Sequence, residues 1–308
     1  MAIIQVRGLK KRFGDHEVIG GVDLSIEEGE VFGLIGPDGA GKSTLIRMIA
    51  GILEPTEGEI YVHGIDAISA YEEIRSAVGY MPQTFGLYGA LTVEENLRFV
   101  ARIHGLGRRE FQDRTEGLYR FSGLGPFKDR RAAQLSGGMR QKLGLSCILI
   151  HQPKILLLDE PTIGVDPISR REFWNTLHSF SSEGVTIFIS TPYLEEAERC
   201  HRIAFLQEGK ILEVLDPRGL RALFPYATCD IYAPEIRGLL RRLRERLPLP
   251  VSFLSGDHIH LVCEKGALDS GELEEILKEL YAEGVQLKKT IPIVQDLYFI
   301  LEKRGHVA

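Results

Sequence analysis

The sequence predicts an α/β protein with a mainly parallel β-sheet, followed by a smaller α+β domain. Largely apolar runs at 31–35, 155–158 and 185–190 are typical of short strands that are buried on both faces. Segments with helical periodicity separate these runs, which favours parallel strands joined by crossover helices. The first run leads directly into a glycine-rich loop and then into a helical pattern. Ligands of open α/β sheets bind at the carboxyl ends of the strands, so we expect a functional site there.

The glycine-rich loop fits the phosphate-binding pattern G-x-x-x-x-G-K-S/T. Its members are Gly36, Pro37, Asp38, Gly39, Ala40, Gly41, Lys42, Ser43 and Thr44. Glycines let the backbone curl around an anion, with its N–H groups and the dipole of the next helix directed inward. Lys42 would reach the β- and γ-phosphates of a nucleotide, and the Ser43 hydroxyl would take one position on Mg²⁺. A plain glycine turn that opens a helix is the alternative; the spacing and the flanking strand and helix favour the nucleotide site.

Composition and charge restrict the class of protein. A hydrophobic content of 44% and a charged content of 26% are those of a globular protein with a sizeable core. The net charge of −6 argues against general affinity for nucleic acid, which needs a basic surface. The four cysteines, at 147, 200, 229 and 263, are not closely spaced, which predicts plain thiols in a reducing, intracellular compartment. No signal peptide and no apolar run near the roughly 20 residues of a membrane span is visible, so we expect any membrane role to come through a partner.

In the first half of the chain, strands precede a helical region. We expect strands at 3–6, 22–26, 59–62 and 78–83. From 91 to about 123 the pattern is helical, and Thr92 with Glu95 forms a capping box at its start. A Ser-Gly-Gly stretch at 136–138 then opens another helix, 140–150, and makes a second potential anion cradle.

Two carboxylates follow the most apolar strand. The run 155–158 is too short for a helix and suits a central parallel strand. Asp159 and Glu160 come where this strand ends, which is where ligands of such sheets bind. Helix capping near Thr162 is the structural alternative, but it explains one carboxylate rather than both. A further strand at 202–206 belongs to the same predicted sheet.

A second unit begins where the character of the sequence changes, between 215 and 225. We expect strand 228–232, helix 235–247, strands 251–254 and 258–263, helix 270–282, strand 285–290 and helix 293–302. The first six form a β-α-β-β-α-β order, which predicts a ferredoxin-like unit. The first helix carries arginines at 237, 241, 242, 244 and 246; a solvated face is the simpler interpretation, and contact with acidic lipid headgroups or an acidic partner is the alternative. His258 and His260 alternate along a strand without a visible third ligand, so metal binding is disfavoured.

Taken together, the glycine loop, Gln83, the Leu-Ser-Gly-Gly-Met stretch 135–139 and the Leu-Leu-Leu-Asp-Glu stretch 156–160 resemble the ATP-binding subunits of ABC transporters. The resemblance covers about residues 2–215, and the Leu-Ser-Gly-Gly element is highly specific to that family. It implies a P-loop NTPase fold with an N-terminal antiparallel β part and a helical subdomain. The implied domains are an ATP-binding domain at 1–218, with its helical subdomain at about 84–150, and a small α+β domain at 225–308 that looks like the extension of drug- and antibiotic-export ATPase subunits.

The resemblance implies a role for each matching residue of the nucleotide site. Phe13, for which packing against a turn is the simpler interpretation when the residue is taken alone, matches the aromatic that stacks on adenine. Residues 36–44 match the phosphate loop, Asp159 matches the carboxylate that supports Mg²⁺, and Glu160 matches the general base that polarises the attacking water. Gln83 matches the glutamine that senses Mg²⁺ and faces the membrane subunit.

Two more elements are implied to act across a dimer. Ser136, Gly137 and Gly138 match the signature that contacts the γ-phosphate of ATP held by the opposite subunit. Asp166 matches the aspartate that couples the two sites. The implied cofactors are ATP and Mg²⁺, and the implied partners are integral membrane permease subunits and a second ATPase subunit, identical or different, without nucleic acid. The implied location is cytoplasmic, peripheral on the inner face of the cell membrane.

Pro192 is the main departure from the family pattern. The family expects a histidine after Ser-Thr in this segment, whereas the sequence has Ser190-Thr191-Pro192. Proline has neither a side-chain donor nor a backbone N–H, so the contact with the γ-phosphate is missing, and His201 lies too far along the chain to replace it. Losing one preorganised donor to a transition state can cost on the order of a hundredfold in rate. Asp38, where asparagine is usual, is a milder departure.

Pro192 leaves two hypotheses open. In the first, the chain pairs with a different ATPase, and the site that uses Lys42 and Glu160 binds ATP but turns over slowly; such proline-bearing stretches resemble one half of fused two-ATPase export subunits. In the second, Glu160 suffices and the protein is an ordinary homodimer. The expected function is therefore an ATP-hydrolysing motor subunit of an export transporter, and the alternative is a regulatory or non-transport ATPase with little turnover.

Overall fold

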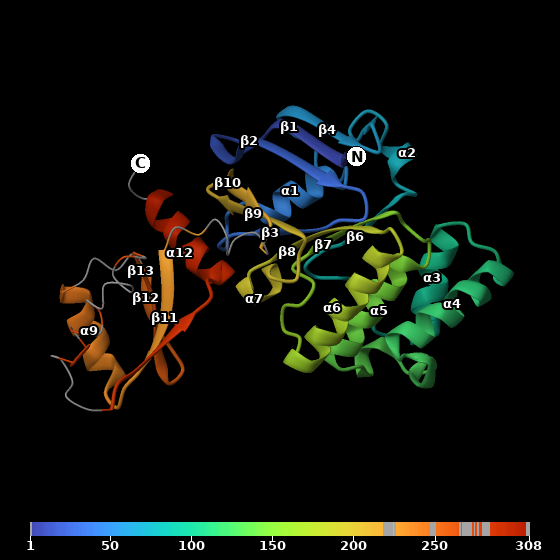
Figure 1. Ribbon diagram of the computed structural model, residues 1–308. Helices are drawn as coiled ribbons and strands as arrows, with labels where there is room; N and C mark the ends of the chain where they lie inside the picture. Colours follow the sequence, from blue (N-terminus) through green and yellow to red (C-terminus); the bar gives the residue numbers. More distant parts are fainter. Residues whose placement is uncertain are drawn as a thin grey trace. The chain divides into compact units, whose positions relative to one another are not determined.

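The chain forms two units, Met1–Val214 and Leu215–Ala308 (Figure 1). This computed structural model describes residues 2–217, 224, 226–246, 251–264 and 284–305, and the single positions 266, 273, 275, 277 and 278. Within the predicted boundary segment, 215–225, residues 218–223 and 225 lie outside the described residues. No helix in the described part of the chain is long and apolar enough to cross a bilayer.

A six-stranded, mainly parallel sheet forms the centre of the first unit. Its order is β10 (Lys210–Leu215), β9 (Arg202–Gln207), β3 (Val31–Ile35), β8 (Thr186–Thr191), β7 (Ile155–Asp159) and β6 (Val78–Met81). The strands from β9 to β6 pair in parallel, and every residue of β3, β7 and β8 is buried. The predicted parallel sheet is confirmed, since continuous apolar runs suit strands covered on both faces. The edge strand β10 was not predicted, because none of its residues is buried and its pattern is mixed.

An antiparallel sheet covers one face of this centre, with a helix between the two. Its order is β2 (His16–Glu27), β1 (Ala2–Phe13), β4 (Glu57–Val62) and β5 (Ile65–Asp66). Strands β1 and β2 are longer than predicted, because several register shifts along the pair interrupt the period-two alternation. Helix α1 (Lys42–Ile49) packs Leu45, Ile46 and Ile49 into the core shared by both sheets.

Helices cover the rest of the first unit. They are α2 (Tyr71–Ile74), α3 (Val93–Ile103), α4 (Arg108–Ser122), α5 (Gly137–Leu149), α6 (Pro167–Ser182) and α7 (Leu194–Ala197), with short 3₁₀ turns at Gly125–Phe127 and Ala132–Gln134. The predicted helical stretch 91–123 is two helices, separated by a turn in which Gly105 has a φ of 73°. The capping box of Thr92 and Glu95 is confirmed at the start of α3. Helices α3, α4 and α5 pack against one another; the limits of the helical subdomain stay a prediction.

The second unit contains a four-stranded antiparallel sheet with helices. Its elements are β11 (Tyr226–Tyr232), α9 (Ile236–Arg246), β12 (Val251–Ser255), β13 (His258–Glu264), β14 (Gln286–Thr290) and α12 (Val294–Gly305), and the strand order is β12-β13-β11-β14. This arrangement agrees with the predicted ferredoxin-like unit. Most of the predicted helix 270–282 lies outside the described residues. Helix α9 buries Leu239, Leu240 and Leu243 and exposes its five arginines.

Candidate functional site

The glycine loop joins the carboxyl end of β3 to the start of α1, and two of its glycines are required by their neighbours. At Gly41, φ is 105°, and a Cβ would lie 2.7 Å from Cδ1 of Ile19. At Gly36, a Cβ would clash with the carbonyl oxygen of Leu206 on β9. Any side chain at these positions would therefore displace the loop or a strand beside it.

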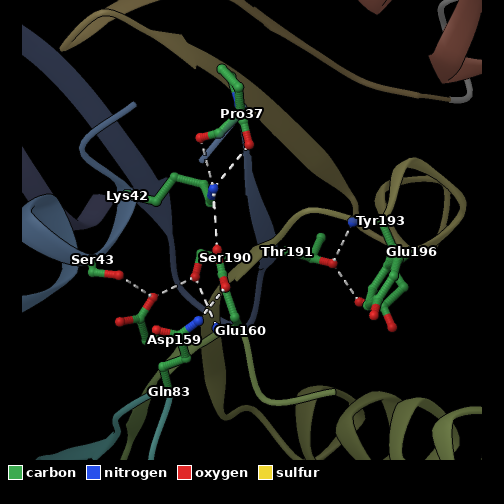
Figure 2. A network of polar contacts seen from close by, with 11 residues as sticks. Pro37, Lys42, Ser43, Gln83, Asp159, Glu160, Ser190, Thr191, Tyr193 and Glu196 are labelled. Atoms are coloured by element: carbon green, nitrogen blue, oxygen red, sulfur yellow. Dashed lines mark hydrogen bonds and ion pairs between the residues drawn. The ribbon is translucent and has the colours of Figure 1, made fainter. Parts of the chain in front are cut away.

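Lys42 is buried and directed back into the loop (Figure 2). Its Nζ donates hydrogen bonds to the carbonyl oxygens of Gly36 and Pro37, at 2.9 and 3.1 Å. The same atom lies 3.1 Å from Oε1 of Glu160, and the two side chains are only 4% and 6% exposed. The ammonium charge is therefore held at the mouth of the loop, where an anion would compete for it.

Asp159 accepts two hydroxyl hydrogen bonds on one oxygen (Figure 2). Ser43 Oγ donates to its Oδ1 at 3.0 Å, and Ser190 Oγ donates to the same oxygen at 2.8 Å. The other oxygen, Oδ2, is buried and has no hydrogen-bond partner among the described residues. A buried carboxylate oxygen without a partner normally has a specific reason, such as an ion that binds there.

Glu160 lies between Lys42 and Gln83 and has an unusual backbone conformation. Gln83 Nε2 donates to Oε2 of Glu160 at 2.9 Å. The φ of Glu160 is 49°, in the left-handed region that few non-glycine residues adopt. The structure thus brings together five predicted residues from separate segments: Lys42, Ser43, Gln83, Asp159 and Glu160.

Ser190 belongs to the same cluster but was not predicted as a site residue. It is fully buried at the end of β8 and pairs in register with Asp159 across the parallel strands. The signal that could have found it is this register, because the two strands end together at the carboxyl edge of the sheet.

The residues at this edge fit a nucleotide with Mg²⁺. The hydroxyl of Ser43 and the oxygens of Asp159 and Gln83 are the oxygen ligands that Mg²⁺ prefers. The first helical hydrogen bond of α1 runs from the N–H of Leu45 to the carbonyl of Gly41, so the N–H groups of the first turn are directed toward the loop. An anionic group bound there would also meet the positive end of the helix dipole.

The Ser-Gly-Gly stretch lies at the start of α5, beside the start of α6. Ser136 caps α5 by accepting the N–H of Met139 at 3.3 Å. A Cβ at Gly138 would lie 2.5 Å from Ser169 Oγ, so only glycine fits against α6 at this point. Among the described residues, no hydrogen bond or ion pair joins Ser136, Gly137 or Gly138 to the glycine loop.

Asp166 is the N-cap of α6 and is exposed. Its Oδ1 accepts the N–H groups of Ser169 and Ile168, at 2.9 and 3.1 Å. These bonds, that of Ser169 foremost, hold the pKa of Asp166 below its usual value. A capping role is therefore visible within the chain, and a role across a dimer stays a prediction.

The remaining predicted residues differ in their exposure. Phe13 ends β1 with 51% of its surface exposed, and Lys11 Nζ lies 5.1 Å from its ring centre. Pro37, Asp38 and Gly39 form the exposed tip of the loop, Ala40 is buried behind it, and Thr44 is half-buried in the first turn of α1. No described contact joins the Phe13 ring to the glycine loop.

Pro192 directly follows β8, and polar contacts of Thr191, Tyr193 and Glu196 lie on either side of it in the chain (Figure 2). Thr191 Oγ1 donates to Oε2 of the buried Glu196 at 2.6 Å and accepts the N–H of Tyr193 at 3.0 Å. The guanidinium of Arg170, from α6, lies 3.9 Å from the centre of the Tyr193 ring. These contacts fix the backbone on both sides of Pro192 without placing a hydrogen-bond donor at that position.

His201 has a structural contact at the opposite edge of the sheet. Its Nδ1 accepts the N–H of Val31, the first residue of β3, at 2.9 Å. The glycine loop begins at the other end of that strand. The expectation that His201 does not replace the histidine missing at position 192 therefore agrees with the structure.

Known proteins are similar to this chain in sequence. A family model described as ABC transporter matches residues 19–163. The chain is 42% identical over 305 residues to the probable multidrug ABC transporter ATP-binding protein YbhF of Escherichia coli, a match that covers 97% of this chain and 52% of that protein. The chain thus spans about half the length of that relative. It is 39% identical over 252 residues to Nod factor export ATP-binding protein I of Cupriavidus metallidurans, covering 80% of this chain and 82% of the relative.

Solved structures also resemble this chain. One described as an ATP-binding subunit of an ABC transporter matches with a TM-score of 0.65 and 32% identity, covering 72% of this chain and 93% of that one. The cbiO1 protein of Clostridium perfringens, described as part of the ABC transporter complex cbiONQ, matches with a TM-score of 0.67 and 26% identity, covering 80% and 96%.

Proposed function

The chain belongs to the ATP-binding subunits of ABC transporters, and on that premise we propose that it binds ATP with Mg²⁺ at the glycine loop and hydrolyses it to drive export through separate membrane subunits. The observation that carries the proposal is the convergence of Lys42, Ser43, Asp159 and Glu160 at one edge of the sheet. A cation and a hydroxyl at the start of a helix, with two carboxylates beside them, are the groups that phosphoryl transfer requires.

Each residue takes a role that its contacts support. Ser43, Asp159 and Gln83 would hold Mg²⁺, which supplies charge neutralisation on the phosphate oxygens. Lys42 would bind the terminal phosphates in exchange for its contact with Glu160. That exchange would release Glu160 to orient the attacking water and accept its proton, which suits a reaction that depends mostly on positioning and charge.

A dimer would explain why the chain has a second potential anion-binding stretch, at 136–138. Ser136, Gly137 and Gly138 lie at the start of α5, and Asp166 lies nearby at the start of α6. We propose that this surface completes the ATP site of a second ATPase subunit, while Phe13 stacks on the adenine bound to its own chain. The second subunit is identical or different.

Export is proposed from the relatives. One is named a probable multidrug transporter component and another a Nod factor export component. Membrane permease subunits would then be the direct partners, with this chain peripheral on the cytoplasmic face. The transported substrate would be set by those subunits.

The proline at position 192 supports the proposal that ATP is cleaved slowly at one of the two sites of the dimer. The chain provides no side-chain donor at this position, so the site built on Lys42 would bind ATP and cleave it slowly. In a pair with a different ATPase, the other site would use this chain's Ser136 signature and turn over normally.

The test uses the purified chain of 308 residues. Binding of a fluorescent ATP analogue with Mg²⁺ should be strong in the wild type and lost in Lys42→Ala, and Glu160→Gln should retain binding but abolish turnover. Absence of nucleotide binding by the wild type would overturn the proposal. Co-purification with a multi-spanning membrane protein tests the transport role; binding without such a partner and without turnover would favour a regulatory ATPase.

A further inference from the structure

Ser190 uses one hydroxyl group to hold two consecutive residues of the site (Figure 2). Its Oγ donates to Oδ1 of Asp159 at 2.8 Å and accepts the N–H of Glu160 at 3.0 Å. The side chain is fully buried. Both the donor and one acceptor position of the hydroxyl are therefore committed to the site.

The contact with Glu160 holds the point where the chain leaves β7. Glu160 has a φ of 49°, a conformation that persists for a non-glycine residue only where surrounding contacts impose it. Its N–H is anchored by Ser190 twice, by Oγ and by the backbone carbonyl at 3.2 Å. This turn directs the Glu160 carboxylate toward Lys42 and Gln83.

The contact with Asp159 fixes which carboxylate oxygen remains available. Ser43 and Ser190 both donate to Oδ1, and Oδ2 is buried without a hydrogen-bond partner in the described part of the chain. A carboxylate held in this way presents Oδ2 in one orientation. Residues that hydrogen-bond a metal ligand, without touching the metal themselves, orient that ligand. Mutating such a residue commonly lowers metal affinity or activity by about 10- to 100-fold.

We propose that Ser190 is a positioning residue of the ATP site: it orients Asp159 for Mg²⁺ and holds Glu160 in the left-handed turn from which it acts on water. The inference rests on the proposed function, since it assigns Ser190 to the same site. It goes beyond that function because Ser190 belongs to β8, outside the phosphate loop and the carboxylate pair, and yet contacts both Asp159 and Glu160.

Thr186 provides a matched control on the same strand. It is also fully buried, and its Oγ1 accepts a backbone N–H, that of Gly29, at 2.9 Å. Thr186 lies at the amino end of β8, whereas Ser190 lies near the carboxyl end, where the site is. Ser190→Ala and Thr186→Ala thus each remove one buried hydroxyl and one hydrogen bond to the backbone, but only the first touches the carboxylates.

The experiment measures binding of a fluorescent ATP analogue in a Glu160→Gln background, so that turnover does not interfere. Ser190→Ala should raise the Mg²⁺ concentration for half-maximal binding about tenfold, with binding in EDTA unchanged. Thr186→Ala should leave both values unchanged. In the Glu160 wild-type background, Ser190→Ala should lower kcat about tenfold with KM for ATP nearly constant, and Ser190→Thr, which keeps the hydroxyl, should restore much of the loss.

The outcomes separate the inference from the proposed function. If the parent protein binds no nucleotide, the proposed function fails and the inference fails with it. If the parent binds and Ser190→Ala keeps the parental Mg²⁺ requirement, only the inference is overturned. Equal losses in Ser190→Ala and Thr186→Ala, with equal falls in melting temperature, would likewise overturn it, because a loss of strand stability would then explain both.

Discussion

The ammonium group of Lys42 and the carboxylate of Glu160 form an ion pair of 3.1 Å inside the protein, with both side chains almost completely shielded from water. Lys42 is the first residue of α1 and Glu160 directly follows β7, so the pair connects two elements of the first unit. It also connects the phosphate loop to the residue proposed as general base.

Breaking this pair from the lysine side should destabilise the first unit. Lys42→Ala would leave Glu160 as an uncompensated buried charge, at an expected cost of about 3 kcal/mol. Glu160→Gln should cost less, because the amide keeps its volume and hydrogen-bonding capacity. Urea unfolding of both variants tests this order, and Lys42→Ala combined with Glu160→Gln should recover part of the stability but no ATP binding. Equal unfolding free energies for Lys42→Ala and the wild type would contradict the prediction.

Restoring a donor at position 192 should increase turnover. Pro192→His would place an imidazole at the end of β8, close to the carboxylate cluster, and one preorganised donor contributes on the order of a hundredfold to rate. We therefore expect an ATPase rate at least several-fold above that of the wild type, measured by phosphate release from the Lys42 site. Pro192→Ala is the control for the backbone change and should not produce the increase. An unchanged rate in Pro192→His would count against the proposed slow site.

The second unit should lose stability as the pH rises. His260 is buried, and its Nδ1 and Nε2 lie 2.6 Å from Asp230 and 2.9 Å from Asp296. Burial alone would lower the pKa of His260, but the hydrogen bonds and charges of Asp296 and Asp230 together raise it above the usual 6.5. Neutral imidazole has one N–H, so the protonated ring alone can donate to both carboxylates. The contribution of the protonated His260 to the unfolding free energy is then complete below about pH 6.5. It is lost as the pH rises through the folded-state pKa of His260.

A pH series of unfolding experiments can measure this effect. In the wild-type protein the unfolding free energy of the second unit should fall as the pH rises from about 6.5 through the folded-state pKa of His260. In His260→Gln this fall should disappear. His258, which lies 3.7 Å from Asp230 and contacts Asp257, shares the same surroundings, so NMR titration of the individual histidines assigns the transition. His63→Gln, an exposed histidine of the first unit, serves as the control. A His260 titration at or below its ordinary range would refute the prediction.

A methyl group on Gly36 should abolish nucleotide binding. Gly36→Ala would bring a Cβ into the carbonyl oxygen of Leu206, and backbone cannot move aside as a flexible side chain can. We expect at least a tenfold loss of affinity for the ATP analogue, because a displaced loop no longer directs its backbone N–H groups at the phosphates. Gly86→Ala is the matched control, since a Cβ there meets nothing within 4 Å and its φ is not positive. Normal binding by Gly36→Ala would show that the loop adapts.

The sequence predicted the contiguous parts of the site well and the parts made by tertiary contact poorly. Lys42, Ser43, Asp159 and Glu160 were found because each lies in a short motif at the end of an apolar run. Ser190 was missed, because its role depends on the register of β8 against β7, which no local pattern reports.

The same reason explains the differences in the fold. The central strands were predicted because burial on both faces leaves a continuous apolar run. The full length of β1 and β2 was missed because register shifts interrupt the alternation, and β10 because it is an edge strand with no buried residue. The pairing of His260 with Asp230 and Asp296 joins residues 30 and 36 positions apart, so the sequence showed only two alternating histidines.

The close packing of Gly36 against Leu206 also sets a condition for protein engineering. A fragment that stops before β9 would contain the whole glycine motif and both carboxylates, yet it would lack the backbone that shapes the start of the loop. Transplanting residues 36–44 into another scaffold would fail for the same reason unless the host sheet offers a strand at that distance. The smallest autonomous version of this site is therefore expected to extend from β1 through β9.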